Sequence, residues 1–172
     1  MSPRWPRVLL AKGAVCTALA IQLGLLARLR LPGADPDAVL VVVVATALSW
    51  GPLGGALVGF GAGLLVDVVP PADHSAGRVA LTLTLVGYLA GLFQAEAARS
   101  ALLPLAVVAV AAVAALVISA AVGTLLGDPR VRWPVVWRGV PAVALYDVVL
   151  TPFVLPWVAA LCRRLEPQVS GR

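Results

Sequence analysis

The hydrophobic positions of this chain form long uninterrupted runs, and short segments between them hold nearly all of the charged residues. Runs that are apolar on every face are typical of helices in lipid, and about 20 such residues cross a hydrocarbon core of about 30 Å. We therefore predict an all-α integral membrane protein, a compact bundle of six transmembrane helices. The predicted spans are residues 8–27, 38–49, 52–69, 79–94, 101–127 and 140–161.

The second and third spans come from one uncharged run, residues 38–66. As a single helix this run is about 44 Å long at about 1.5 Å per residue, well beyond the hydrocarbon core. The run contains Trp50-Gly51-Pro52, where Gly-Pro favours a break and Trp favours the membrane interface. We predict two short helices joined by a tight turn; one continuous helix would leave five spans. The first is too short to cross upright, and we expect it to thin the membrane or to be shielded by its neighbours.

The composition supports a membrane protein that forms a single domain. Of the 172 residues, 61% are hydrophobic and 12% are charged, whereas a soluble domain is about 25% charged. This excludes a soluble enzyme, a disordered chain and a DNA-binding domain. The net charge of +5 is interpreted as arginine at membrane surfaces rather than as nucleic-acid binding. A signal peptide is the alternative for the first span, because Ala18-Leu19-Ala20 resembles a cleavage site inside that hydrophobic run.

The sequence contains few residues that could form a catalytic or metal-binding site. His74 is the single histidine, and one histidine cannot build a metal site unaided. Cys16 and Cys162 lie near opposite ends of the chain and are interpreted as small apolar residues. The sequence holds no Ser-His-Asp arrangement, HExxH motif or phosphate-binding loop. We predict a protein that is not an enzyme, with no catalytic residues, no metal site and no cofactor.

Glycines recur every four residues in the third predicted span, so that they share one helix face. The series is Gly51, Gly55, Gly59 and Gly63. Without side chains, this face lets another backbone approach closely, as in helix pairs within lipid. Gly87 and Gly91 on the following span are the predicted mates. The face packs within the chain or, together with Phe60, helps to form a partner or ligand site; both interpretations are open.

Two acidic residues lie next to or inside apolar runs, where a carboxylate costs about 2.5–3.5 kcal/mol on insertion scales. Asp67 continues the four-residue series, and we expect it to cap the following turn or to pair with Arg78. Asp147 lies deeper in its span, beside Tyr146, and is expected to pair with an arginine or to hydrogen-bond in the core.

The segment Gly59-Phe60-x-x-Gly63-x-x-x-Asp67, followed by Gly77-Arg78-x-Ala80-Leu81 and Tyr88-Leu89, resembles the rod shape-determining protein MreD family. The resemblance extends over nearly the whole chain, although this segment is its specific part. It implies a multi-pass scaffold in the bacterial inner membrane that supports peptidoglycan synthesis and cell shape.

The partners that the resemblance implies are MreC, the MreB filament, the RodA glycosyltransferase and a class B penicillin-binding protein. The high content of Ala, Val, Gly and Arg is typical of a GC-rich actinomycete, where the spore wall is the expected setting. In fold, the family is similar to the substrate-binding subunits of energy-coupling-factor transporters. The alternative function is therefore a small-molecule binding or transport subunit of that type.

Overall fold

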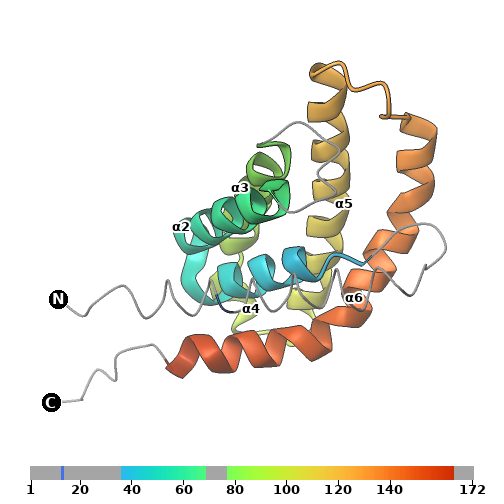
Figure 1. The fold of residues 1–172 in the computed structure, drawn as a ribbon. Helices are drawn as coiled ribbons and strands as arrows, with labels where there is room; N and C mark the ends of the chain where they lie inside the picture. Colours follow the sequence, from blue (N-terminus) through green and yellow to red (C-terminus); the bar gives the residue numbers. More distant parts are fainter. Residues whose placement is uncertain (1–12, 14–35, 69–76, 165–172) are drawn as a thin grey trace, which may run out of the picture.

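The computed structural model describes residues 13, 36–68 and 77–164, and within these residues it contains helices and no strands (Figure 1). The all-α prediction is confirmed for this part of the chain. The predicted span 8–27 lies outside the described residues, except for Gly13. The helices are α2 (Ala38–Val68), α3 (Arg78–Gly91), α4 (Gln94–Ala97), α5 (Leu103–Leu125) and α6 (Trp133–Arg164).

Three of the described helices, α2, α5 and α6, are long and apolar enough to cross a membrane, and α3 is a shorter apolar helix. Large apolar side chains project from their outer faces, including Leu53, Leu125 and Trp157, each more than 70% exposed. A soluble protein rarely presents so much contiguous apolar surface, whereas lipid solvates it. The chain is therefore a membrane protein.

Helix α2 breaks at Gly51, where the backbone has φ 78° and ψ −172°. Pro52 follows and has no N–H, so the helical hydrogen-bond ladder cannot continue through this point. The two halves of α2 fold back on each other (Figure 1), and a Cβ on Gly55 would touch that of Ala47. The carbonyl of Ser49, freed by the break, accepts a hydrogen bond from Nε2 of Gln94 at 2.8 Å. The two short helices predicted around Trp50-Gly51-Pro52 are confirmed.

Gly51→Ala is expected to destabilise the protein by about 1–2 kcal/mol, because a residue with a Cβ strains at positive φ. The added methyl group would also lie 2.7 Å from Oε1 of Gln94. Thermal unfolding in detergent measures the loss. Gly61→Ala is the matched control, because a Cβ at Gly61 meets open space. Equal melting temperatures for the two variants would argue against the importance of the break.

The first half of α2 forms the centre of the molecule. Every residue from Ala38 to Ala47 is buried, and none of them is more than 4% exposed. A helix that is apolar on all sides is stable only where neighbours or lipid cover all of its faces. Of the two arrangements that we expected for this short helix, shielding by its neighbours is therefore the one that the structure has.

Helix α6 extends beyond the predicted span 140–161, because it begins at Trp133. The connection between α5 and α6 therefore ends at Arg132, well before the start of the predicted span. Pro134 lies in the first turn, where its missing N–H costs nothing, and the rings of Trp133 and Trp137 lie 6.3 Å apart, one turn from each other. Three further prolines lie inside α6, and Figure 1 shows the helix bending around the other elements.

Candidate functional site

The glycine face of α2 packs directly against the backbone of α3. A Cβ added to Gly55 would overlap the carbonyl oxygen of Gly87, and one added to Gly87 would overlap that of Gly55. Gly59 lies in the same way on the carbonyl of Leu83, and Gly63 lies on Ala80. The spacing by four residues has therefore placed backbone against backbone along the whole pair, as the sequence predicts.

Gly51, at the start of the series, and Gly91 on α3 complete this contact. Gly91 lies against Gly51 and Pro52, so that its Cβ would meet their backbone atoms. All six glycines of the face are buried. They are covered by the chain itself, and this surface is not open to a partner.

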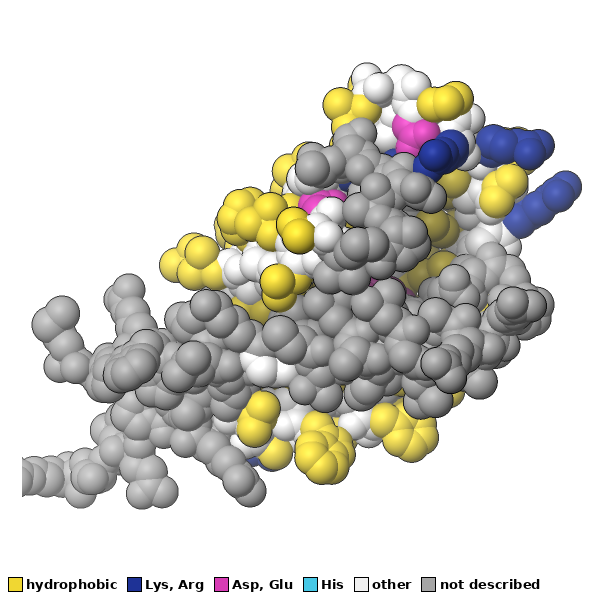
Figure 2. Space-filling model, viewed as in Figure 1, with side chains coloured by type: hydrophobic (Ala, Val, Ile, Leu, Met, Phe, Trp, Pro, Cys, Tyr) yellow, Lys and Arg dark blue, Asp and Glu magenta, His cyan; other side chains and the backbone are white. Residues whose placement is uncertain are grey.

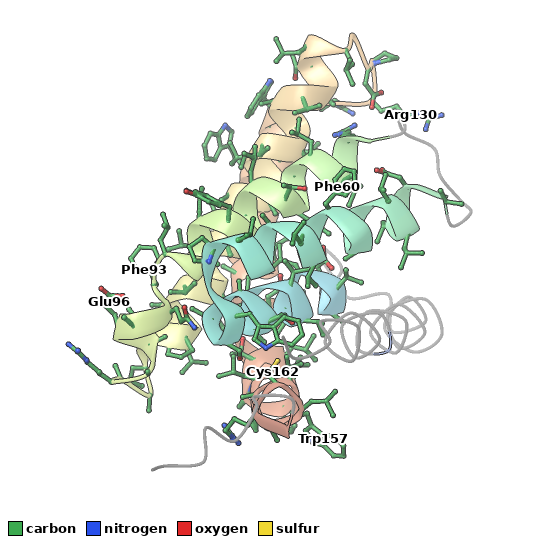
Figure 3. All side chains as sticks on the ribbon, turned by 90° about the vertical axis from the view of Figure 1, so that its left-hand side faces the viewer. Phe60, Phe93, Glu96, Arg130, Trp157 and Cys162 are labelled. Carbon is green, nitrogen blue, oxygen red and sulfur yellow. The ribbon has the colours of Figure 1, made fainter. Side chains whose placement is uncertain are left out.

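Phe60 and Tyr88 lie on the outside of the same helix pair. Their side chains are 51% and 48% exposed, and Figure 3 shows Phe60 on the outer side of α2. Phe60 belongs to an exposed apolar stripe on α2, with neighbours three or four residues apart. The stripe consists of Leu53, Leu57, Phe60, Leu64 and Val68.

Asp67 joins the end of α2 to the start of α3. Its side chain is buried and accepts hydrogen bonds from three backbone N–H groups: Oδ2 from Gly77 at 2.9 Å and Ala80 at 3.1 Å, and Oδ1 from Val79 at 3.2 Å. The first N–H groups of a helix have no partner within the helix, and a carboxylate there also meets the positive end of the helix dipole. Of the two predicted roles of Asp67, capping is the one that the structure has.

Arg78 directs its side chain to α5 and to the loop after it. Its Nη1 lies 3.0 Å from Oδ2 of Asp128, and its Nε donates to Oγ of Ser119 at 3.0 Å. Gly123 provides the room, because a Cβ there would collide with the guanidinium. Arg78 therefore ties the start of α3 to the far end of α5.

The pKa of Asp128 is held below its ordinary value. The main cause is the backbone N–H of Arg130, which donates to its Oδ1; desolvation opposes this effect, and the Arg78 guanidinium lowers the pKa by a smaller amount. A carboxylate with a lowered pKa stabilises the folded state above its ordinary pKa of about 4, and this contribution is lost as the pH falls through the lower folded value.

Asp128→Asn is therefore expected to lower the melting temperature by a constant amount between pH 5 and pH 8 (about 1 unit or more above the ordinary pKa). The gap from wild type narrows below about pH 4, as the native carboxyl becomes protonated. Melting curves of both proteins from below pH 4 up to pH 8 measure this gap, and a gap that does not narrow at low pH would refute the stabilising role of the Asp128 carboxylate.

Asp147 is fully buried on α6 and meets the N-terminal end of α2. Its Oδ1 accepts a hydrogen bond from the backbone N–H of Asp37 at 2.8 Å. The carboxylate of Asp37 in turn accepts from the N–H of Leu40 at 2.9 Å and so caps α2. The other oxygen of Asp147, Oδ2, has no hydrogen-bond partner within the described part of the chain. Of the two predicted roles, hydrogen bonding in the core is the observed one; Tyr146 beside it is half-buried.

A cavity of about 220 Å³ opens beside this carboxylate, between α2, α3, α5 and α6. Its walls are mainly apolar. Four polar side chains lie among them: Asp37, Thr82, Ser119 and Asp147.

Four of the polar residues that matter here were not predicted from the sequence: Asp37, Thr82, Ser119 and Asp128. Asp37 carries a signal that could have been read, because an Asp directly before an apolar run is a frequent N-cap. Asp128 and Ser119 carry none, since their partner Arg78 is 50 and 41 residues away.

The described residues contain no group of three or more His, Cys, Asp or Glu side chains that could hold a metal ion. No protein-family model, curated protein or solved structure matches the chain.

Proposed function

We propose that the chain is a non-enzymatic scaffold of the bacterial cell-wall elongation machinery, of the MreD type, in the inner membrane. The observation that carries this proposal is how the side chains of the resembling segment are used. Its polar groups, Asp67 and Arg78, are engaged in holding α2, α3 and α5 together, while Phe60 and Tyr88 face outward.

This arrangement fits a protein that presents a fixed surface. The α2–α3 pair is rigid because its backbones touch along four turns, which leaves no room for sliding. A partner that crosses the membrane once can lie along the exposed stripe of α2, where van der Waals packing favours helix association in lipid. We propose that this partner is MreC and that Phe60 and Tyr88 contact it.

The wider assembly follows from the resemblance. We propose a six-span body similar to the energy-coupling-factor subunits, in which residues 8–27 supply the first span. The scaffold would work with MreB, RodA and a class B penicillin-binding protein in peptidoglycan synthesis, at the spore wall if the source is a filamentous actinomycete.

The test is co-purification of tagged MreC with this chain in a mild detergent. Phe60→Ala/Tyr88→Ala is expected to reduce the recovered MreC about tenfold, as the loss of aromatic anchors does at interfaces. Phe153→Ala/Trp157→Ala is the matched control, because these aromatics are 69% and 80% exposed on α6; Figure 3 shows Trp157 far from Phe60. Failure of the wild-type chain to retain MreC while it is monodisperse would refute the scaffold.

The alternative function, a small-molecule binding subunit, is favoured by one specific observation, the cavity beside Asp147. A binding subunit needs a concave site with a few convergent polar groups, and Asp37, Thr82, Ser119 and Asp147 contribute such groups to the wall.

A further inference from the structure

We propose that the cavity beside Asp147 binds a primary ammonium group that carries a small apolar body. This inference names the ligand chemistry for the alternative function above. It does not depend on the capture of a protein partner, because the cavity lies between helices and the outward stripe of α2 is a separate surface.

The charge of the ligand follows from Asp147. Its side chain is 0% exposed, and Oδ2 has no hydrogen-bond donor within the described residues. An unsatisfied carboxylate oxygen is costly to bury, so the site gains most from a ligand that brings N–H donors and a positive charge. Arg78, the basic residue of α3, is already engaged by Asp128 and Ser119, so its charge is balanced elsewhere.

The acceptors in the wall suit an ammonium group. The Thr82 hydroxyl donates its hydrogen to the carbonyl of Arg78 at 2.9 Å and so offers the cavity only lone pairs. Asp37 lies on the same wall with a second carboxylate. An ammonium group has three donors and no acceptor, which matches the oxygen atoms of Asp37, Thr82 and Asp147 better than a hydroxyl or an amide does.

The size and the remaining wall define the rest of the ligand. A cavity of about 150 Å³ holds benzene, so one of 220 Å³ takes a ligand of about nine non-hydrogen atoms. The rest of the wall is mainly aliphatic and favours an apolar body. It includes Leu40, Val79, Leu83, Leu116 and Val143.

Two sources share this chemistry: a free small amine and the ethanolamine headgroup of a phospholipid. Benzylammonium is a suitable probe, because it has eight non-hydrogen atoms, and benzyl alcohol is its neutral counterpart of equal size. Both are titrated by calorimetry against the full chain in phosphatidylcholine nanodiscs, whose lipid headgroup carries no primary ammonium; empty nanodiscs give the background.

We expect saturable binding of benzylammonium that is at least about tenfold tighter than that of benzyl alcohol, and a loss of about tenfold in Asp147→Asn, since charge-assisted hydrogen bonds are the strong ones. Glu96→Gln is the matched control, because Glu96 is an exposed carboxylate on α4 (Figure 3) and does not line the cavity. This variant should bind benzylammonium as the wild type does. If Asp147→Asn does not fold, Ala115→Leu replaces it, because Ala115 lines the cavity and a larger side chain fills it.

Nanodiscs that contain phosphatidylethanolamine separate the two sources. Competition with benzylammonium identifies the lipid headgroup, and unchanged binding identifies a free amine; either result supports an ammonium site. Equal affinity for benzylammonium and benzyl alcohol, or binding that survives both Asp147→Asn and Ala115→Leu, would overturn the proposal. Co-purification of MreC tests the scaffold separately, so one hypothesis can fail without the other.

Discussion

Gly59→Leu is expected to abolish the folded state or to lower its melting temperature by about 10 °C or more. The added side chain would begin inside the carbonyl oxygen of Leu83, and backbone cannot rotate away as a flexible side chain can. Overpacking of a dense interior costs about 1–3 kcal/mol when side chains give way, so contact with backbone should exceed this range. About 3 kcal/mol corresponds to about 10 °C for a chain of this size.

The measurement is size-exclusion chromatography in detergent, followed by thermal unfolding of any monodisperse fraction. Gly61→Leu is the control, because it makes the same change two residues away on the same helix, at an exposed position where a Cβ meets nothing within 4 Å. Gly61→Leu should elute and melt as wild type does. Wild-type behaviour of Gly59→Leu as well would mean that α2 and α3 are not packed backbone to backbone.

The glycine face shows how far local sequence can predict this fold. A repeat of four residues determines a helix face, and in lipid a face without side chains has few uses other than close packing. The contacts with Gly87 and Gly91 were predictable, because α3 is short and runs antiparallel to the second half of α2. Successive turns of the two helices therefore align. The break at Gly51 was predictable for a similar reason, since Gly-Pro acts on its own backbone.

The polar contacts were not predictable, because they join distant segments. Asp147 meets the N–H of Asp37 across 110 residues, and Arg78 meets Asp128 across 50. Nothing local distinguishes Arg78 from the other arginines as the partner of Asp128. The choice depends on Gly123, whose missing side chain leaves room for the guanidinium.

Exposed apolar side chains and exposed arginines occupy different parts of the surface, which the composition alone does not show. Figure 2 shows apolar side chains spread over the helices and arginines gathered near the end of α5 and the start of α6. The exposed arginines of this region are Arg130, Arg132 and Arg138. These three arginines lie close to Trp133 and Trp137 in the chain, and arginine together with tryptophan is typical of a membrane interface.

Asp67→Ala is expected to destabilise the protein by about 2–4 kcal/mol, because three backbone N–H groups lose their acceptor at once. Nothing nearby in the described chain replaces it: Gly77, the N-cap of α3, has no side chain, and its φ of 89° fixes the turn in place. Water cannot readily substitute at a carboxylate that is only 6% exposed. A loss of this size corresponds to about 5–15 °C in melting temperature.

The location of the loss distinguishes capping from a general effect of charge. Amide hydrogen exchange in Asp67→Ala should rise at the first turn of α3, residues 77–81, ahead of the second half of α2. Asp67→Asn keeps one acceptor oxygen and should lose about half as much stability, since one or two of the three bonds survive. Glu96→Ala removes an exposed carboxylate and should leave both measurements at their wild-type values. If exchange at residues 77–81 stays slow in Asp67→Ala, then the backbone of α3, rather than this carboxylate, holds its first turn.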